Sequence, residues 1–184
     1  MDIKDRIINA CRELAKSRGL AGFTVDELAN RAGVSKRTVY RYYRSKEEII
    51  EAAADAFMGE VAAEADRLIT VCEDPVNILN QMLGYLFAHG QFITNPASFN
   101  DLRQHYPELW KKIDKFRIER IKQIISTVGN KSNLVTDIDP RILTAVISTS
   151  VQSILNPDFI LENGLNFEKT AEQLSRFLMS AVLR

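Results

Sequence analysis

Apolar residues recur at helical spacing along nearly the whole chain, and no stretch alternates convincingly between apolar and polar positions as a strand would. The pattern therefore predicts an all-α protein of about nine helices. The first helix is expected to begin at residue 3 and to end at Gly19, after two basic residues in its last turn. The chain contains no internal repeat, no low-complexity tract and no Gly/Ser-rich linker.

Two capping boxes mark the next helix starts. Thr24 and Glu27 have the spacing at which a hydroxyl and a carboxylate each accept an otherwise unpaired backbone N–H, and Ser45 and Glu48 repeat it. The first box predicts a helix that ends at Gly33. A very short helix, 36 to about 43, should follow, and the second box should open a longer helix that continues to about residue 68.

Five further helices are expected in the rest of the chain, because apolar periodicity is interrupted there by proline, glycine and asparagine. Asp-Pro or Asn-Pro pairs stand at 74–75, 95–96, 139–140 and 156–157, and the last pair is interpreted as a stop. The predicted spans are 75–94, 97–104, 107–128, 140–155 and 167–183. We expect two domains: residues 1–45, a three-helix helix-turn-helix domain, and residues 46–184, a carboxy-terminal helical bundle.

Charge is distributed unevenly although the net charge is zero. Residues 1–50 hold 11 Lys and Arg against 7 Asp and Glu, and the remaining residues hold 13 against 17. A basic end on an acidic body suggests that a polyanion contacts one end only. The chain begins with charged residues instead of an apolar signal segment, and it lacks an apolar run long enough to span a bilayer. We expect a cytoplasmic protein with no membrane partner, whose Cys11 and Cys72 are reduced.

The most informative stretch is residues 24–46, which predicts a helix-turn-helix. One helix ends at Gly33, a tight turn follows, and the next helix is too short to be stable without its neighbours. Small residues at 29 and 32 allow the two helices to approach closely. The apolar contacts between the helices come from Leu28, Ala29, Ala32, Val34 and Val39.

The outward face of the second of these helices has the chemistry of a nucleic-acid contact. Residues 35–46 include five basic residues, three tyrosines and no acid. Lys36 or Arg37 can reach guanine O6 and N7 in the major groove, and the Thr38 methyl group can touch a thymine methyl. The alternative is a solvated basic face on a helix pair used only for packing, but such faces normally mix both signs of charge and carry few tyrosines. The pattern favours DNA.

With these motifs in place, the first fifty residues resemble the TetR (tetracycline-repressor) family of transcriptional regulators. The resemblance is carried by FTVDELA at 23–29, AGVS at 32–35, TVY at 38–40, YY at 42–43 and KEE at 46–48. It extends over about a quarter of the chain and is specific in order and spacing. The rest of the chain is similar to the family in helical architecture only.

The resemblance implies roles for individual residues. Thr24 matches a phosphate-contacting cap, Tyr40 an aromatic that touches the DNA backbone, and Lys46 a lysine that anchors a phosphate. Tyr43 matches a buried aromatic and is assigned to the core. Position 37 is commonly small in the family, so Arg37 suggests an additional base or phosphate contact. The predicted DNA-binding residues are Thr24, Ser35, Lys36, Arg37, Thr38, Tyr40, Arg41, Tyr42 and Lys46.

The resemblance also implies a dimer that forms through the last two helices, about residues 140–184, and a small-molecule site between helices four and seven. Residues 142–155 carry no charge on any face, which predicts a helix buried all round. A partner chain covering one side would achieve this, in a two-fold-symmetric four-helix bundle. The alternative is a central helix of a monomer.

Aromatic residues and methionine gather in the middle of the chain, and each of them taken singly is better interpreted as core. As a group they suit an apolar or amphipathic effector. No carboxylate or cysteine stands at metal-ligand spacing from either histidine, so no metal or cofactor is expected. The candidate pocket residues are Met82, Tyr85, His89, Phe92, Phe99, His105, Tyr106, Trp110 and Phe116.

Together these features predict a ligand-responsive repressor that binds a palindromic operator. Two alternatives stay open. An enzyme could use the helical body, although the chain has no nucleophile elbow, Gly-rich phosphate loop or HExxH motif. A protein-interaction module could use the basic turn to bind an acidic partner, and binding to a palindromic duplex would separate these cases.

Overall fold

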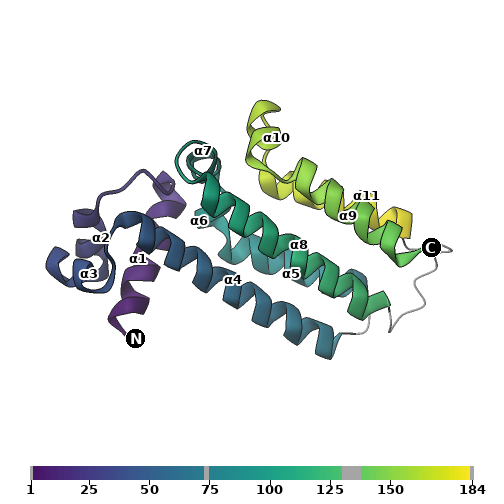
Figure 1. Cartoon of the computed structure of the whole chain (residues 1–184), viewed down its shortest axis with the longest axis horizontal. Helices are drawn as coiled ribbons and strands as arrows, with labels where there is room; N and C mark the ends of the chain where they lie inside the picture. Colours follow the sequence, from purple (N-terminus) through teal and green to yellow (C-terminus); the bar gives the residue numbers. More distant parts are fainter. Residues whose placement is uncertain (1, 73–74, 130–137, 183–184) are drawn as a thin grey trace.

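The computed structural model describes residues 2–72, 75–129 and 138–182, and every regular element within these ranges is an α-helix. The all-α prediction is confirmed. Helices α1 (Ile3–Arg18), α2 (Val25–Ala32) and α3 (Lys36–Tyr42) gather at one end of the molecule, here called the head (Figure 1). The other helices form the body: α4 (Lys46–Val71), α5 (Pro75–His89), α6 (Gln91–Thr94), α7 (Pro96–Gln104), α8 (Pro107–Gly129), α9 (Pro140–Ile154), α10 (Pro157–Glu162) and α11 (Phe167–Val182).

The long helix α4 connects the two parts of the molecule. It packs on α1 at the head and on α5 and α8 in the body, while α6 and α7 fill the space between α1 and α8 (Figure 1). Helices α9 and α11 run in opposite directions on the far side of α5 and α8. One apolar cluster extends from Ile7 and Leu28 in the head to Ile50 and Phe57 in α4, so the core does not stop at the predicted boundary after residue 45.

Local capping chemistry explains why the helices of the head begin where they do. The Thr24 hydroxyl accepts the Glu27 N–H, and the Glu27 carboxylate accepts the Thr24 N–H, so the first predicted capping box is confirmed. The second is half-formed. Ser45 accepts the Glu48 N–H at 3.2 Å, but the Glu48 carboxylate accepts the N–H of Arg44.

The prediction of one helix from 75 to 94 is wrong, because the chain bends at Gly90. The Gly90 N–H donates to Leu86 O at 2.7 Å, and a Cβ at position 90 would lie 2.5 Å from that oxygen and 3.1 Å from the Phe57 ring. A side chain would therefore collide with α4 and with the preceding turn. The glycine permits this close approach, and the chain continues as the separate short helix α6.

A second difference follows Asn156-Pro157, which was interpreted only as a stop. The Asn156 side chain accepts the Phe159 N–H at 2.9 Å, and Pro157 occupies the first turn of α10, where its missing N–H costs no hydrogen bond. The same pair thus ends α9 and begins α10. Together with the bend at Gly90, this raises the count in the described residues from about nine helices to eleven.

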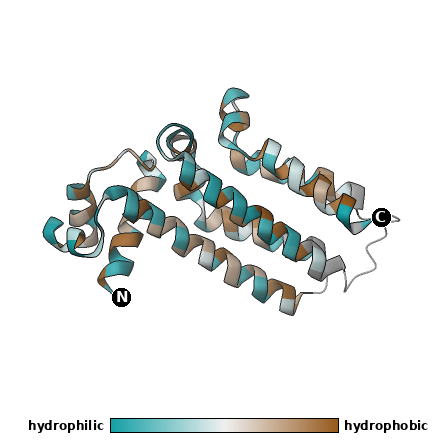
Figure 2. Ribbon diagram, in the orientation of Figure 1, coloured by the Kyte–Doolittle hydropathy of each residue, from teal (hydrophilic) through white to brown (hydrophobic). Residues whose placement is uncertain are grey.

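The uncharged helix is not buried all round within the single chain. On α9, Ile142 is 58 % exposed and Val146 51 % exposed, and on α11 Phe177 is 69 % exposed. Around Val151 and Leu174 the inner faces of α9 and α11 pack on each other, with α9 lying on α8 and α11 on α5. Apolar segments recur along both helices in Figure 2. The alternative of a central monomer helix is therefore wrong, because α9 lies at the surface.

The two cysteines are free, as predicted. Cys11 on α1 is completely buried, and burial raises the pKa of its thiol to about 12. Within the described ranges, no helix is both long and apolar enough to cross a membrane.

Candidate nucleic-acid interface

The turn between α2 and α3 depends on a glycine. Gly33 adopts the left-handed conformation, with φ 65° and ψ 39°, and its carbonyl accepts a hydrogen bond of 2.8 Å from the Arg6 guanidinium. The backbone angle favours glycine, and a Cβ at this position would lie 2.6 Å from an Arg6 nitrogen, so a side chain would displace the guanidinium that supports the turn. Leu28 and Val39, on either side of the turn, are fully buried. The geometry confirms the predicted helix-turn-helix.

The amino-terminal turn of α3 is capped by a hydroxyl and carries two exposed basic residues. The Ser35 Oγ accepts the Thr38 N–H at 3.0 Å and lies 2.9 Å from the Thr38 hydroxyl. Lys36 and Arg37 are exposed. The Lys36 ammonium lies 2.8 Å from Asp26 of α2, and the hydrogen bond to that carboxylate raises the lysine's pKa. Both side chains are at least half exposed, so Lys36 can leave Asp26 and bind another anion at little cost in free energy.

The remainder of α3 separates into an anchoring face and an exposed face. Tyr43, directly after the helix, is 7 % exposed, as predicted for a core aromatic, and burial raises the pKa of its phenol. Tyr40 is 47 % exposed, and the Arg41 guanidinium lies 5.2 Å from the centre of the Tyr42 ring. The exposed face of α3 therefore combines cations with phenols, and α3 itself contains no acidic residue.

Thr24 lies at the start of α2, at the edge of the head. Its side chain is exposed and shares a hydrogen-bond network with Glu27, which also accepts a bond of 2.6 Å from Arg18. These bonds, of which the one from the Thr24 N–H is the largest contribution, lower the pKa of Glu27 to about 2. Glu27 is thus an ionised cap that orders the loop–helix junction.

Lys46 lies at the start of α4, but its ammonium is directed inward. It donates to Ala21 O at 2.8 Å and to Phe23 O at 2.6 Å, and it lies 4.2 Å from the centre of the Phe23 ring. Partial burial lowers its pKa. In this structure Lys46 therefore secures the connection between α1 and α2, and its contact with a phosphate stays a prediction.

The nine residues predicted for a ligand pocket do not share one environment. Two ring pairs form among them: Tyr85 with His89, at 4.5 Å between centroids, and Phe99 with Trp110, at 6.0 Å. Their role in ligand binding also stays a prediction. The side chains are buried for Met82, Phe92 and Phe99, half-buried for Tyr85, Tyr106, Trp110 and Phe116, and exposed for His89 and His105.

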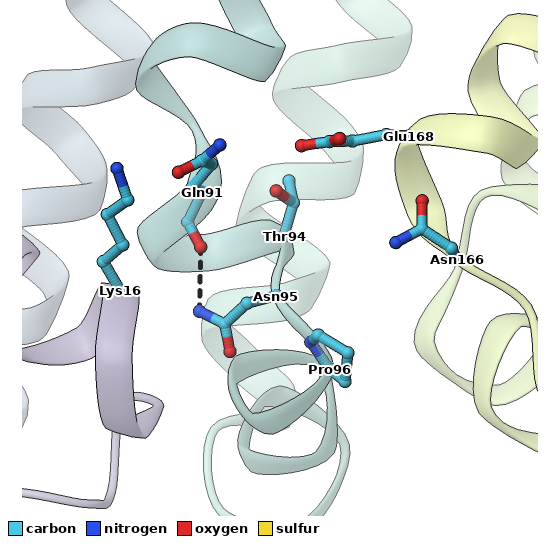
Figure 3. A pocket seen from close by; sticks show the side chains of 7 residues that line it. All are labelled: Lys16, Gln91, Thr94, Asn95, Pro96, Asn166 and Glu168. Carbon is cyan, nitrogen blue, oxygen red and sulfur yellow. Dashed lines mark hydrogen bonds between the residues drawn. The ribbon is translucent and has the colours of Figure 1, made fainter.

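A hollow of about 190 Å³ lies elsewhere, between the end of α1, the junction of α6 and α7, and the start of α11 (Figure 3). Figure 3 shows the Lys16 amine and the Glu168 carboxylate on opposite sides of it. None of the nine predicted pocket residues lines it. Six of its seven lining residues have polar side chains, and the lining consists of Lys16, Gln91, Thr94, Asn95, Pro96, Asn166 and Glu168.

Four side chains that organise the head were not found from the sequence. Arg6 supports the turn at Gly33, and Asp26 pairs with Lys36. Asn95 and Asp101, both on the body side, bond to the backbone of the head. The Asn-Pro pair could have identified Asn95 as a helix cap, but no local pattern indicates its second bond or the role of Asp101.

Residues 7–53 match the family described as "Bacterial regulatory proteins, tetR family". This span begins in α1, contains the whole helix-turn-helix and ends within α4. All nine predicted DNA-binding residues lie inside it.

Longer similarities extend over the body. The uncharacterised HTH-type transcriptional regulator YvaF of Bacillus subtilis (strain 168) is 24 % identical over 96 % of this chain and 94 % of the relative. A TetR transcription regulator from Haloarcula marismortui ATCC 43049 has a TM-score of 0.72 at 18 % identity, covering 100 % of this chain and 99 % of that one. FadR from Bacillus subtilis, solved in complex with stearoyl-CoA, has a TM-score of 0.64 at 18 % identity, covering 97 % and 99 %. At these identities the two structures establish a shared fold.

Proposed function

The chain belongs to the TetR family of DNA-binding transcriptional regulators, and from this premise we propose that it is a ligand-responsive repressor that binds a palindromic operator as a homodimer. The observation that carries the proposal is the exposed face of α3. Lys36, Arg37, Tyr40 and Arg41 face solvent without an acid in the helix, while Val39 and Tyr43 anchor it from behind.

In the proposed complex, α3 enters the major groove by its amino-terminal turn. Arg37 and Lys36 contact guanine O6 and N7, and Lys36 exchanges Asp26 for the DNA. Tyr40, Tyr42 and Thr24 supply hydroxyl groups to phosphates on either side of the groove. Asp26 then repels the DNA backbone and helps to exclude poorly aligned sites.

The homodimer is proposed to form through α9 and α11. Ile142, Val146 and Phe177 on these helices are apolar and more than half exposed to water, and a second copy would bury them. Two-fold symmetry then presents two α3 helices to half-sites about one turn of duplex, roughly 34–36 Å, apart. A change of a few ångström in this spacing would prevent both heads from binding at once.

The effector is proposed to be an apolar or amphipathic small molecule that binds in the body. The support is the concentration of aromatic side chains on α5 to α8 and the fold shared with FadR, which was solved with stearoyl-CoA. Added to the operator complex, stearoyl-CoA is the first probe, and release of DNA is the expected result. If acyl-CoA esters of all chain lengths leave the complex intact, this ligand class is wrong, and DNA binding is unaffected by that outcome.

DNA binding is tested by selection from random duplex DNA, followed by sequencing of the bound pool. A palindrome is expected, and its half-site separation also reports the symmetry of the dimer. Failure to enrich any duplex at moderate ionic strength would contradict the proposal.

The residues are then tested on the selected operator. Lys36→Ala and Tyr42→Ala are each expected to weaken binding by about tenfold or more without loss of helicity, since a base or phosphate contact contributes roughly 1–3 kcal/mol. Lys111→Ala is the matched control, because this exposed lysine lies on α8 in the body. Unchanged affinity in both head variants would refute the assignment.

A further inference from the structure

The connection between α1 and α2, residues 19–23, is held by side chains that come from the body of the molecule. Asn95, the cap of α7, accepts the Ser98 N–H at 2.9 Å, and its amide nitrogen donates to Ala15 O in the last turn of α1 at 3.1 Å. One side chain thus caps the start of α7 and binds the end of α1.

Asp101, on α7, makes the second attachment. Its Oδ2 accepts the Ala21 N–H at 2.8 Å, and the residue is 8 % exposed. Gly19 has φ 81°, and a Cβ there would lie 2.6 Å from the same carboxylate oxygen and 2.9 Å from Cβ of Ala97. Helix α7 therefore packs directly on the backbone of the connection, at a spacing that only glycine allows.

Lys46 makes the third attachment from the opposite side. Because it donates to Ala21 O and Phe23 O, the residue Ala21 is held at its N–H by α7 and at its carbonyl by α4. Thr24, the cap of α2, follows Phe23 directly. The position of α2, and of α3 packed on it, is thus tied to two helices of the body.

We propose that Asp101 and Asn95 are positioning residues for DNA binding, which fix the α1–α2 connection and thereby set Thr24 and α2 at the spacing that the operator requires. The proposal rests on the proposed contact of Thr24 with DNA. A displacement of α7 would loosen the connection. Helix α7 also packs on α8 and α10, so it is placed to relay a change in the body.

The charge of Asp101 makes the proposal distinguishable from a general electrostatic effect. Replacing a carboxylate by a neutral residue makes the protein more positive, and long-range attraction to DNA then predicts equal or tighter binding. Loss of the positioning bond predicts weaker binding. The two explanations therefore have opposite signs.

The experiment compares Asp101→Ala and Asp101→Asn with Glu119→Ala, which removes an exposed carboxylate that pairs with Lys115 within α8 and changes the net charge equally. Hydrogen exchange at the Ala21 amide should accelerate in Asp101→Ala, and operator affinity should fall by about tenfold, the effect of losing a hydrogen bond to a charged group. Asp101→Asn keeps an acceptor and should lose less. Glu119→Ala should leave both measurements unchanged.

A double-mutant cycle with Thr24→Ala separates positioning from simple destabilisation. If Asp101 acts through Thr24, the two losses are not additive, and the slope of log affinity against log salt falls by about 1 in either single variant, the value for one phosphate contact. Faster Ala21 exchange with unchanged affinity overturns the proposal, as do fully additive losses. If Asp101→Ala does not fold, the same two measurements on Asp101→Asn decide. Failure of the wild-type protein to bind any duplex would instead contradict the proposed function, while the exchange measurement still reports the attachment.

Discussion

The head and the α9–α11 pair are both helical, but they differ in which side chains they bury within the single chain. In the head, Leu28 and Val39 are completely buried within one chain, and charged and phenolic side chains face outward. On α9 and α11, Ile142 and Phe177 remain more than half exposed, beside the exposed charged residues Lys169, Glu172 and Arg176 of α11. The head presents cations and phenols, to which we assign the DNA contact, and α9 and α11 present exposed apolar side chains, to which we assign the proposed dimer contact.

The exposed fractions of apolar side chains distinguish the α3 surface from the α9 surface more clearly than helix length or charge content does. The helix around Val39 is only seven residues long, yet its apolar side is fully covered. Helix α9 is fifteen residues long and carries no charge beyond Arg141, yet half of Val146 is exposed. Three substitutions test the difference between the two regions.

The largest effect is expected from Phe177→Glu. In a two-fold dimer the new carboxylate would be buried in both copies, at a cost of several kcal/mol per ion, so the variant should be monomeric where the wild-type protein is dimeric. Sedimentation velocity measures this directly. Phe159→Glu, at a 37 % exposed position on α10, is the control and should keep the wild-type mass. A monomeric wild-type protein, or a dimeric Phe177→Glu, would contradict the proposed interface.

A smaller effect is expected from Leu28→Ala in the core of the head. Removal of a fully buried leucine should lower the free energy of unfolding by about 2–5 kcal/mol, through lost burial and the cavity left behind. Urea unfolding followed by circular dichroism at a fixed protein concentration gives the value. Val71→Ala, at a 62 % exposed position, should change it by no more than about 0.5 kcal/mol. Equal losses in the two variants would mean that the head lacks the packing described.

The smallest effect is expected from the pH dependence of Glu27. Its pKa in the folded protein is about 2, below the ordinary value of 4.5, so the ionised form favours folding. This contribution is complete above pH 4.5 and decreases as the pH falls towards 2. Glu27→Gln keeps a capping oxygen but does not titrate, so urea midpoints of the two proteins should converge on acidification. A difference that is the same at pH 7 and pH 3 would contradict this cause.

The helices of the head could be predicted because their signals are local. Thr24 and Glu27 cap α2 from within four residues, and Gly33 supplies the turn conformation that follows. Each of these contacts joins residues within a short segment, so its pattern can be recognised without knowing which distant residues lie nearby. The family resemblance then assigned roles to the same positions, although Lys46 turns its ammonium towards Phe23 instead of solvent.

What could not be predicted depends on contacts between distant parts of the sequence. Ala21 and Asp101 are separated by 80 positions, as are Ala15 and Asn95, and no periodic pattern marks either pair. The close approach of Phe57 to Gly90 likewise comes from another helix, and no local pattern indicates it. The aromatic group on α5 to α8 suggested a single pocket, but spacing alone cannot tell which rings meet.

Because Cys11 is completely buried, the rate at which its thiol is alkylated reports how often the core around α1 opens. Alkylating reagents attack the thiolate, which scarcely forms near neutral pH when the pKa is about 12 and which no reagent reaches in the closed structure. Each modification of Cys11 therefore records one opening of the core around α1, while the partly exposed Cys72 reacts independently and serves as the reference. The labelling ratio, followed by mass spectrometry, would show how often the protein opens, and whether a bound duplex slows that opening.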